Sequence, residues 1–207
     1  MFYQFAAHIV RGLIWLINGK VTVLNQDKVP DSEYVLVGPH RTWWDPLFFA
    51  AVGYPTVYMF MAKKELFKNP IIGWIIRHAN GFSVDRDNPG PSVIKIPVKG
   101  LKKGNMSLII FPSGSRHSSD MKDGALLIAR MAKKPIVPLV DQGPLKFSGL
   151  FKRNNVTLAY GDPIDPLSFS KNKELASQEF DQILKDSFNA LDQSINPDFK
   201  YIDQHKK

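Results

Sequence analysis

Short apolar runs alternate with longer segments of helical periodicity along this chain, and that alternation limits its possible folds more than any other feature. A short apolar run bounded by turn residues is typical of a buried strand, whereas apolar residues that recur every three or four positions indicate a helix. The pattern predicts strands at 21–24, 34–37, 55–62, 82–84, 107–111, 135–140 and 156–160, and helices that begin at Pro46 or cover 71–76, 92–103, 122–133 and 174–195. Strands that alternate with helices predict a three-layer α/β domain.

Two of the predicted helices start with the same signal. Asp45-Pro46 and Asn69-Pro70 each place a helix-capping residue before a proline, which fits the first turn of a helix. The helix after Asn69 is apolar on all sides, so we expect it to be buried, with contact to lipid as the alternative. Two further helix faces are predicted to pack inward: Leu126, Leu127 and Met131 in the first, and Phe180, Ile183, Leu184, Phe188, Leu191 and Ile195 in the second.

Residues 1–17 are predicted to form a helix whose apolar surface is interrupted by a narrow polar stripe of Gln4, His8 and Arg11. Such a helix is roughly 25 Å long, which is shorter than the ~30 Å hydrocarbon core of a bilayer. Its aromatic residues suit the headgroup region, so we expect an interfacial helix that lies in one leaflet. The alternative is an amphipathic helix packed on the sheet. The predicted organisation is an interfacial helix at 1–20 and one globular domain at 21–207.

Composition excludes several classes of protein. The 207 residues include 44% hydrophobic and 22% charged residues, as in a globular domain with a sizeable core. The absence of cysteine excludes disulfides, cysteine metal sites and a thiol nucleophile, and it fits a reducing compartment. The five histidines do not follow the spacings of metal ligands, so we predict no metal.

The net charge of +8 indicates an anionic partner. An anionic membrane surface or a phosphorylated substrate is favoured over nucleic acid, because the lysines and arginines are dispersed and no basic–aromatic signature accompanies them. We therefore predict no nucleic-acid partner.

His40 and Asp45 lie in one predicted strand-to-helix loop, between the strand at 34–37 and the helix that begins at Pro46. Such loops often carry function in α/β proteins. A carboxylate at this distance can accept the Nδ1 proton of the imidazole, fix its tautomer and leave Nε2 free to accept a proton. The chain has no cysteine and no Gly-x-Ser-x-Gly elbow, so the pair is predicted to activate a hydroxyl of a substrate.

Three further blocks follow in order: Gly81-Phe-Ser-Val-Asp-Arg86, Phe111-Pro-Ser-Gly-Ser-Arg116 and Pro135-Ile-Val-Pro138. With His40-x4-Asp45 they resemble the four motifs of the glycerolipid acyltransferase family, of the lysophosphatidate (1-acylglycerol-3-phosphate) acyltransferase type. The resemblance covers roughly residues 34–141.

That resemblance implies an acyltransferase domain with a mixed central sheet. The implied activity moves a fatty acyl group from a thioester, either acyl-CoA or acyl-carrier protein, to the free hydroxyl of lysophosphatidate, and so yields phosphatidate. No cofactor beyond the acyl donor is implied. The implied location is the cytoplasmic face of a membrane, as a peripheral or monotopic protein.

Residue by residue, His40 is the predicted general base and Asp45 orients it. The acceptor phosphate is predicted to contact Arg86 and Arg116, whose planar guanidinium groups pair with phosphate oxygens, with the alternative that Arg86 pairs with Asp85 or Asp87. Gly114 would permit close backbone approach, and the hydroxyls of Ser113 and Ser115 would donate hydrogen bonds. The block at 135–138 carries no reactive group and is predicted to be a core strand.

Two residues depart from the family pattern. Ser113 stands where the family usually has glutamate, and Pro39 stands where it usually has asparagine before the histidine. With these two departures, the motifs do not specify which headgroup the acceptor carries. The alternatives to acyl transfer are a lysophospholipid hydrolase or remodelling enzyme, and a non-catalytic protein that binds anionic lipid at a membrane surface.

Overall fold

The computed structural model describes residues 2–85, 88–112, 124–199 and 201. Its strands are β1 (Thr22–Leu24), β2 (Val35–Val37), β3 (Tyr58–Lys63), β4 (Gly81–Val84), β5 (Ser107–Ile110), β6 (Ile136–Gln142) and β7 (Thr157–Tyr160). Its α-helices are α1 (Phe2–Asn18), α2 (Asp45–Val52), α3 (Pro70–His78), α4 (Ser92–Lys103), α5 (Gly124–Ala132) and α6 (Lys173–Ile195). Each predicted strand and helix is present, with ends displaced by a few residues.

The strands form one sheet in the order β1-β7-β6-β2-β5-β3-β4. Neighbouring strands are parallel except β6 and β7, which are antiparallel, so the predicted mixed sheet is confirmed. Val37 of β2 lies opposite Ile110 of β5 and Pro138 of β6. Because these three strands are parallel, the segments that follow them emerge at the same edge of the sheet.

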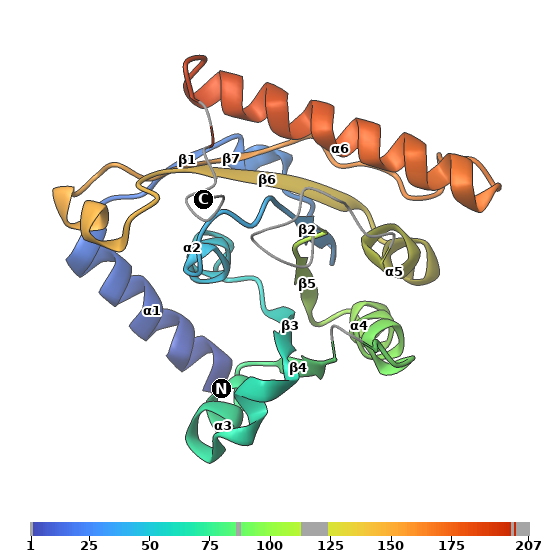
Figure 1. Ribbon diagram of the computed structural model, residues 1–207, viewed down its shortest axis with the longest axis horizontal. Helices are drawn as coiled ribbons and strands as arrows, with labels where there is room; N and C mark the ends of the chain where they lie inside the picture. The colour runs from blue at the N-terminus through green and yellow to red at the C-terminus, as the bar shows by residue number, and fades with distance from the viewer. Residues whose placement is uncertain (1, 86–87, 113–123, 200, 202–207) are drawn as a thin grey trace.

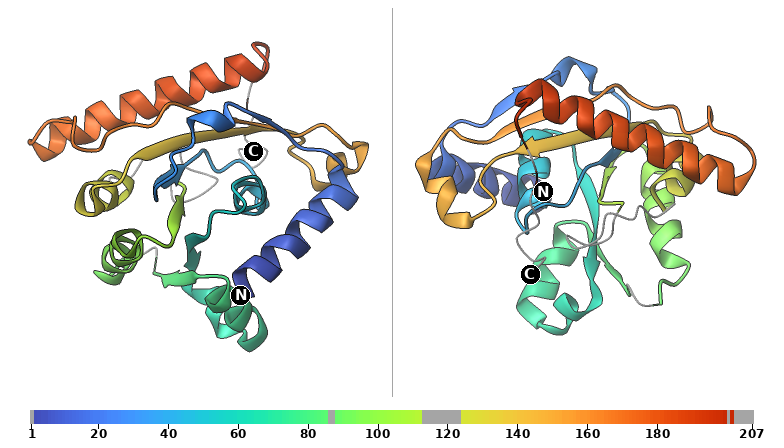
Figure 2. Two further views of the ribbon diagram at one scale, coloured as in Figure 1. Left: turned by 180° about the vertical axis from the view of Figure 1, so that it is seen from behind. Right: turned by 45° about the horizontal axis from the view of Figure 1, so that its top comes forward.

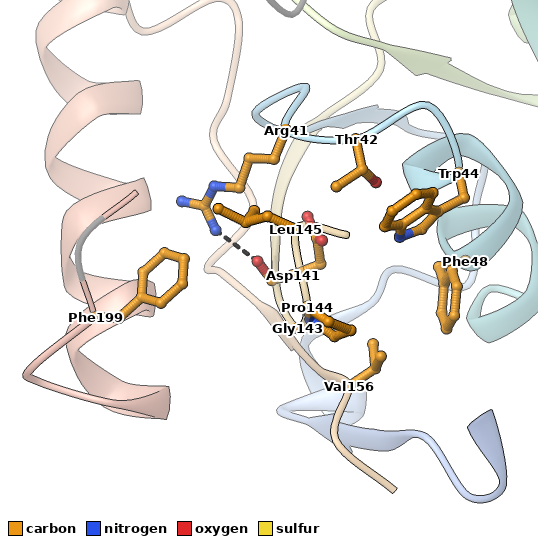
Figure 3. Close-up of a pocket in the computed structure, with 10 residues that line it drawn as sticks. All are labelled: Arg41, Thr42, Trp44, Phe48, Asp141, Gly143, Pro144, Leu145, Val156 and Phe199. Carbon is orange, nitrogen blue, oxygen red and sulfur yellow. Dashed lines mark hydrogen bonds between the residues drawn. The ribbon is translucent and has the colours of Figure 1, made fainter. Parts of the chain in front are cut away.

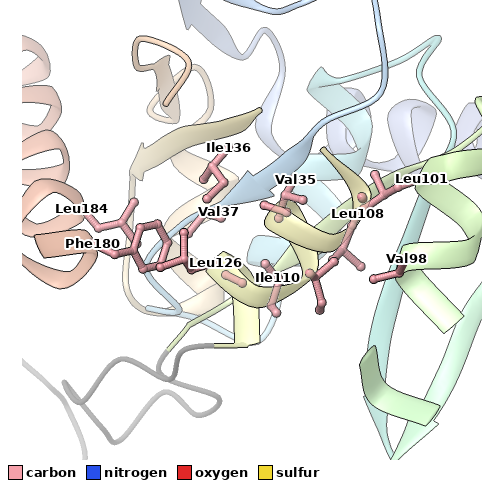
Figure 4. Packing of buried hydrophobic residues seen from close by; sticks show 14 of the residues in the cluster. Val35, Val37, Val98, Leu101, Leu108, Ile110, Leu126, Ile136, Phe180 and Leu184 are labelled. Atoms are coloured by element: carbon pink, nitrogen blue, oxygen red, sulfur yellow. The ribbon is translucent and has the colours of Figure 1, made fainter. Parts of the chain in front are cut away.

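Helices cover both faces of the sheet, which confirms the predicted three layers. Helices α4, α5 and α6 lie on one side, and α1 and α2 lie on the other (Figures 1 and 2). Alternate residues of β2 point to opposite faces of the sheet. Val35 and Val37 pack in the hydrophobic cluster with α4–α6, whereas Leu36 packs in the cluster with α2. Figure 4 shows the first cluster, in which Phe180 and Leu184 of α6 approach Val37 and Leu126.

The long helix α6 follows its predicted pattern closely. The Asn172 side chain caps its first turn and accepts hydrogen bonds from two of its amides. Phe180, Leu184, Phe188 and Leu191 are buried as predicted. Ile183 is 40% exposed, because it lies at the margin of the buried stripe.

The predicted inner face of α5 is partly wrong. Leu126 is buried, but Leu127 and Met131 are each 46% exposed. The helix instead buries Leu126 together with Ala125, Ile128, Ala129 and Ala132. Small alanines allow α5 to lie close to α4 and the sheet, and this rotates the two larger side chains outward.

The predicted burial of α3 is also wrong. Its exposed residues include four large apolar side chains: Ile71, Ile72, Trp74 and Ile75. The helix lies beyond the edge strand β4 and packs on that strand and on the 3₁₀ turn η2 (Lys64–Lys68). A helix in that place covers little of the sheet, so most of its apolar surface stays outside the core.

Helix α1 packs on the domain along one side and exposes apolar side chains on the other. Tyr3, Ile14 and Ile17 pack against the cluster that contains α2, and the helix also contacts the 3₁₀ turn η3 (Phe147–Lys152). Its opposite side exposes Phe5, Ile9, Leu13 and Leu16. Its first turn reaches α3, where the Phe2 and Trp74 rings lie 5.1 Å apart.

No helix within the described part of the chain is long and apolar enough to cross a bilayer. The division into a helix at 1–20 and a domain at 21–207 stays a prediction.

Candidate active site

The segments that follow β2, β5 and β6 meet at one edge of the sheet. We call residues 38–44, between β2 and α2, the His40 loop. It begins at Gly38, where a Cβ atom would lie 2.3 Å from the Phe49 ring and 2.6 Å from the Leu139 carbonyl oxygen. A side chain there would push the loop away from β6, so glycine permits this close approach.

His40 and Asp45 form the pair that the sequence predicts. Nδ1 of His40 lies 3.3 Å from Oδ2 of Asp45, whose side chain is fully buried, whereas the His40 side chain is 15% exposed. An ionised carboxylate only accepts hydrogen bonds, so Nδ1 carries the hydrogen and donates a hydrogen bond to Asp45. Nε2 is therefore left with a lone pair, as a general base requires.

The Asp45 carboxylate is held by the His40 loop itself. The backbone N–H groups of Arg41 and Thr42 donate to its Oδ2 over 2.6 and 2.7 Å, and the Thr42 hydroxyl donates to Oδ1. The prediction that Asp45 caps α2 is therefore wrong. Trp44 takes the N-cap position, and Asp45 is the first residue of the helix, with its side chain directed back to the preceding turn.

Phe111 fixes the other side of the imidazole. Its ring stacks on that of His40, with centroids 4.4 Å apart and planes inclined by 24°. Phe111 follows β5 and belongs to the sequence block at 111–116, but no local pattern in the chain indicated that its ring would reach His40. The contact depends on the parallel pairing of β2 and β5, which places both segments at the same edge.

His40 lines a cavity of about 580 Å³. Most of the wall is hydrocarbon, and its lining includes Phe60, Met61, Val84, Val93, Ile94, Ile109, Ile110 and Phe111. A cavity of this size and character suits an apolar chain rather than a compact polar ligand. Among the described residues, no group of three His, Asp or Glu side chains is placed to hold a metal ion.

The predicted phosphate-binding residues lie outside the described residues: Arg86, Ser113, Gly114, Ser115 and Arg116. Asp85, Pro112 and Gly124, which adjoin these segments in the chain, line the same cavity as His40. Asp85 also accepts a hydrogen bond of 2.5 Å from Lys64. The phosphate-binding role of the two arginines stays a prediction.

One acidic residue near the ends of β2, β5 and β6 was not predicted from the sequence. Asp141, in β6, is buried, and its Oδ1 accepts no hydrogen bond from the residues that the structure describes. Burial raises the pKa of this carboxyl to about 8, and the nearby Asp45 carboxylate adds to the increase, whereas the Arg41 guanidinium opposes it. The sequence did contain a signal for this residue, because Asp141 directly follows the apolar run at 135–140.

Comparison with known proteins shows the family of this chain. A family model described as Acyltransferase matches residues 20–141, which include the His40 loop, and the chain belongs to this acyltransferase family. The resemblance seen in the four sequence blocks is thereby confirmed.

Among its relatives, the 1-acyl-sn-glycerol-3-phosphate acyltransferase of Streptococcus pneumoniae is 46% identical over 195 residues, which cover 93% of this chain and 74% of that protein. The Bacillus subtilis enzyme of the same name is 40% identical over 199 residues, which cover 92% of this chain and 99% of that protein. The fold resembles the crystal structure of the 1-acyl-sn-glycerophosphate acyltransferase PlsC from Thermotoga maritima, with a TM-score of 0.68, 21% identity and coverage of 96% and 83% of the two chains.

Proposed function

We propose that this protein transfers a fatty acyl group from an acyl thioester to the free hydroxyl of lysophosphatidate, which gives phosphatidate. The observation that carries the proposal is the His40 imidazole, oriented by Asp45 and placed in the wall of a large apolar cavity. The relatives at 46% and 40% identity, both named for this reaction, support the choice of acceptor.

The chemistry follows from the tautomer of His40. Nε2 removes the proton from the acceptor hydroxyl as its oxygen attacks the thioester carbonyl, and the C–S bond then breaks. The imidazolium returns its proton to the departing thiolate, so the enzyme is restored. Asp45 stabilises the imidazolium without taking its proton. General-base catalysis of this kind contributes about 10²–10⁴-fold to the rate.

We assign the acyl chain to the apolar cavity and the acceptor phosphate to Arg86 and Arg116. The cavity supports the first assignment by its size and its hydrocarbon lining. The second rests on the sequence blocks that contain the two arginines. A hydroxyl on a glycerol phosphate would then lie between the acyl group and the phosphate site, next to Nε2 of His40.

The donor is acyl-CoA or acyl-carrier protein, and both are anionic. Helix α4 lines the cavity through Val93 and Ile94 in its first turn. Farther along it exposes Lys95, Lys99, Lys102 and Lys103 and contains no acidic residue. A basic surface beside the cavity attracts an anionic donor of either kind. Turnover measured with each donor in turn distinguishes the two.

We also propose that the protein lies on the cytoplasmic face of a membrane without crossing it. Exposed apolar side chains gather on two helices that touch one another, α1 and α3, and they include Phe5, Ile9, Leu13, Trp15, Ile71 and Trp74. Exposed apolar side chains that gather on neighbouring helices favour contact with a partner or a lipid surface. A lipid acceptor could enter the site from such a surface.

The central test is His40→Ala, assayed by mass spectrometry with mixed lysolipids and both donors. We expect formation of phosphatidate by the unaltered protein and a loss of about 100-fold or more in the variant. His8→Ala is the matched control, because His8 is exposed on α1 and its ring contacts Tyr54. Near-normal turnover in His40→Ala would contradict the mechanism. Release of free fatty acid without acylated product would indicate a hydrolase instead.

A further inference from the structure

Arg41 directly follows His40, yet its side chain points away from the apolar cavity. Its side chain is 7% exposed, and its guanidinium pairs with Asp192 of α6, to which Nη1 and Nη2 donate in a bidentate arrangement. Nη1 also donates to the backbone carbonyl of Asp141 over 2.5 Å (Figure 3). Paired arrangements of this kind are among the strongest hydrogen bonds in proteins and fix geometry as well as charge.

The C-terminal region surrounds this ion pair. Gln142 donates through Nε2 to Oδ1 of Asp192 over 2.9 Å and to its backbone carbonyl over 2.8 Å. The guanidinium carbon of Arg41 lies 5.0 Å from the Phe199 ring centroid and 5.8 Å from that of Tyr201. Arg41 is therefore held by a carboxylate, a carbonyl and two aromatic faces, all of which come from β6, from α6 or from the residues after α6.

The same residue is bonded to the catalytic pair through its backbone. The Arg41 N–H donates to Oδ2 of Asp45, the oxygen that also accepts the hydrogen bond from His40. A displacement of Arg41 would move this N–H and with it the carboxylate that orients the imidazole. Small displacements of catalytic groups, of about 1 Å, can lower a rate by about 100-fold.

A direct role in substrate binding does not fit Arg41. It does not line the cavity that contains His40; it lines a separate small pocket with Asp141 and Phe199 (Figure 3). Its guanidinium is already occupied by Asp192 and by the Asp141 carbonyl. It therefore acts on the site through its position rather than through contact with phosphate.

We propose that Arg41 is a positioning residue, through which Asp192 of α6 holds the His40 loop in place. Asp192 lies outside residues 20–141, the part of the chain that the acyltransferase model matches. The C-terminal helix therefore belongs functionally to the active site, although it carries no catalytic group. The kinetic test of this proposal rests on the proposed acyl transfer, but the structural test does not.

The structural test compares hydrogen exchange of the amides at 38–45 in Asp192→Asn and in Asp186→Asn. Asp186 lies on the same helix, is exposed and accepts a hydrogen bond from Gln182, so it is a matched control. We expect exchange to become about tenfold faster in Asp192→Asn, since a hydrogen bond to a charged group is weakened, and to stay unchanged in Asp186→Asn. Unchanged exchange in both variants would overturn the proposal, whether or not the protein has the proposed activity.

The kinetic test uses Arg41→Ala. We expect kcat to fall by about 10–100-fold while KM for acceptor and donor changes less than about threefold. In an Asp45→Asn background the same substitution should have little further effect, because the two residues act as one unit. A dominant increase in the acceptor KM, or a full additional loss in that background, would overturn the proposal.

A double variant separates positioning from stability. Removal of one partner leaves a buried charge, whereas Arg41→Met with Asp192→Leu removes both charges and can restore stability. We expect the double variant to unfold close to the wild-type temperature and still to show the lowered kcat. A return of kcat together with stability would mean that the ion pair serves the fold alone, and would overturn the proposal.

Discussion

Two helices of this protein begin with the same kind of dipeptide and use it in opposite ways. At α3, the Asn69 side chain caps its own helix and accepts hydrogen bonds of 3.0 Å from two amides of the first turn. At α2, the Asp45 side chain turns back and accepts from the amides of the preceding loop and from His40. The first pattern stabilises a helix, whereas the second builds the proposed catalytic pair.

The comparison shows that a carboxylate before proline can accept hydrogen bonds from the preceding loop when packing against the core holds the helix in place. Helix α2 is anchored by packing, because Phe48 and Phe49 are buried. Helix α3 packs on the edge strand β4 and the turn η2, buries Gly73 rather than a large side chain, and has an apolar exposed face. The start of α2 therefore belongs to the proposed active site, and the start of α3 belongs to the proposed lipid-facing surface.

The largest expected effect concerns the start of α2. Asp45→Asn keeps the shape of the side chain but removes the charge that stabilises the imidazolium, so we expect kcat to fall by about 10²–10⁴-fold. Product formation at saturating substrates measures this change, and circular dichroism checks that the variant is folded. A loss of less than about tenfold would mean that Asp45 is mainly structural, like Asn69.

The next effect follows from the pKa of Asp141, which burial and the Asp45 charge raise from an ordinary value of 3.8 to about 8. Between these values the folded protein holds a proton that the unfolded chain has lost. The free energy of unfolding therefore falls by about 1.4 kcal/mol for each unit of increasing pH in this interval.

Asp141→Asn should remove that slope. Urea denaturation at several pH values between 5 and 8 should give a stability difference, variant minus wild type, that increases with pH. Asp186→Asn, at an exposed position, should show no such trend. Parallel curves for Asp141→Asn and wild type would contradict the expectation.

A smaller effect concerns the exposed face of α3. Replacement of Ile71 and Trp74 by serine should weaken binding to anionic vesicles by about tenfold or more, because burial of one large apolar side chain contributes about 1.5–3 kcal/mol. Vesicle sedimentation measures the change. Leu175 and Ile183 are exposed apolar residues on α6, so serine at those two positions is the control. Equal losses in both pairs would argue against a lipid-facing surface at α3.

The smallest effect concerns the cap of α3. Asn69→Ala removes the acceptor for two amides and should lower the free energy of unfolding by about 1 kcal/mol, as at other helix caps. Turnover of soluble substrate should stay the same, since Asn69 has no contact with the His40 loop among the described residues. Thermal unfolding and kcat together test this contrast with Asp45→Asn.

Much of the fold could be predicted from the sequence because its signals are local. Apolar runs predicted the strands, and periodic stripes predicted α6 and its buried residues. The predictions failed where burial depends on location in the fold. The apolar helix at α3 was predicted to be buried, but it lies at the edge of the sheet, and Leu127 and Met131 face outward because α5 packs through its alanines.

The site divides in the same way. His40 and Asp45 are five positions apart, so their pairing could be predicted from one loop. Phe111 and Asp192 reach that loop from distant parts of the chain, and no local pattern indicates such contacts. The predicted roles of Arg86, Ser113, Gly114, Ser115 and Arg116 concern residues outside the described part of the structure and stay predictions.

The sequence by itself determined the order of strands and helices, the pairing of His40 with Asp45, and the family. These properties depend on side chains that are close along the chain or on motifs in a fixed order. Only the tertiary structure decided which oxygen of Asp45 accepts which hydrogen bond, which ring stacks on His40, and that a helix more than 130 residues away holds Arg41. Parallel strand pairing brings such segments to one edge, and that arrangement exists only in the folded chain.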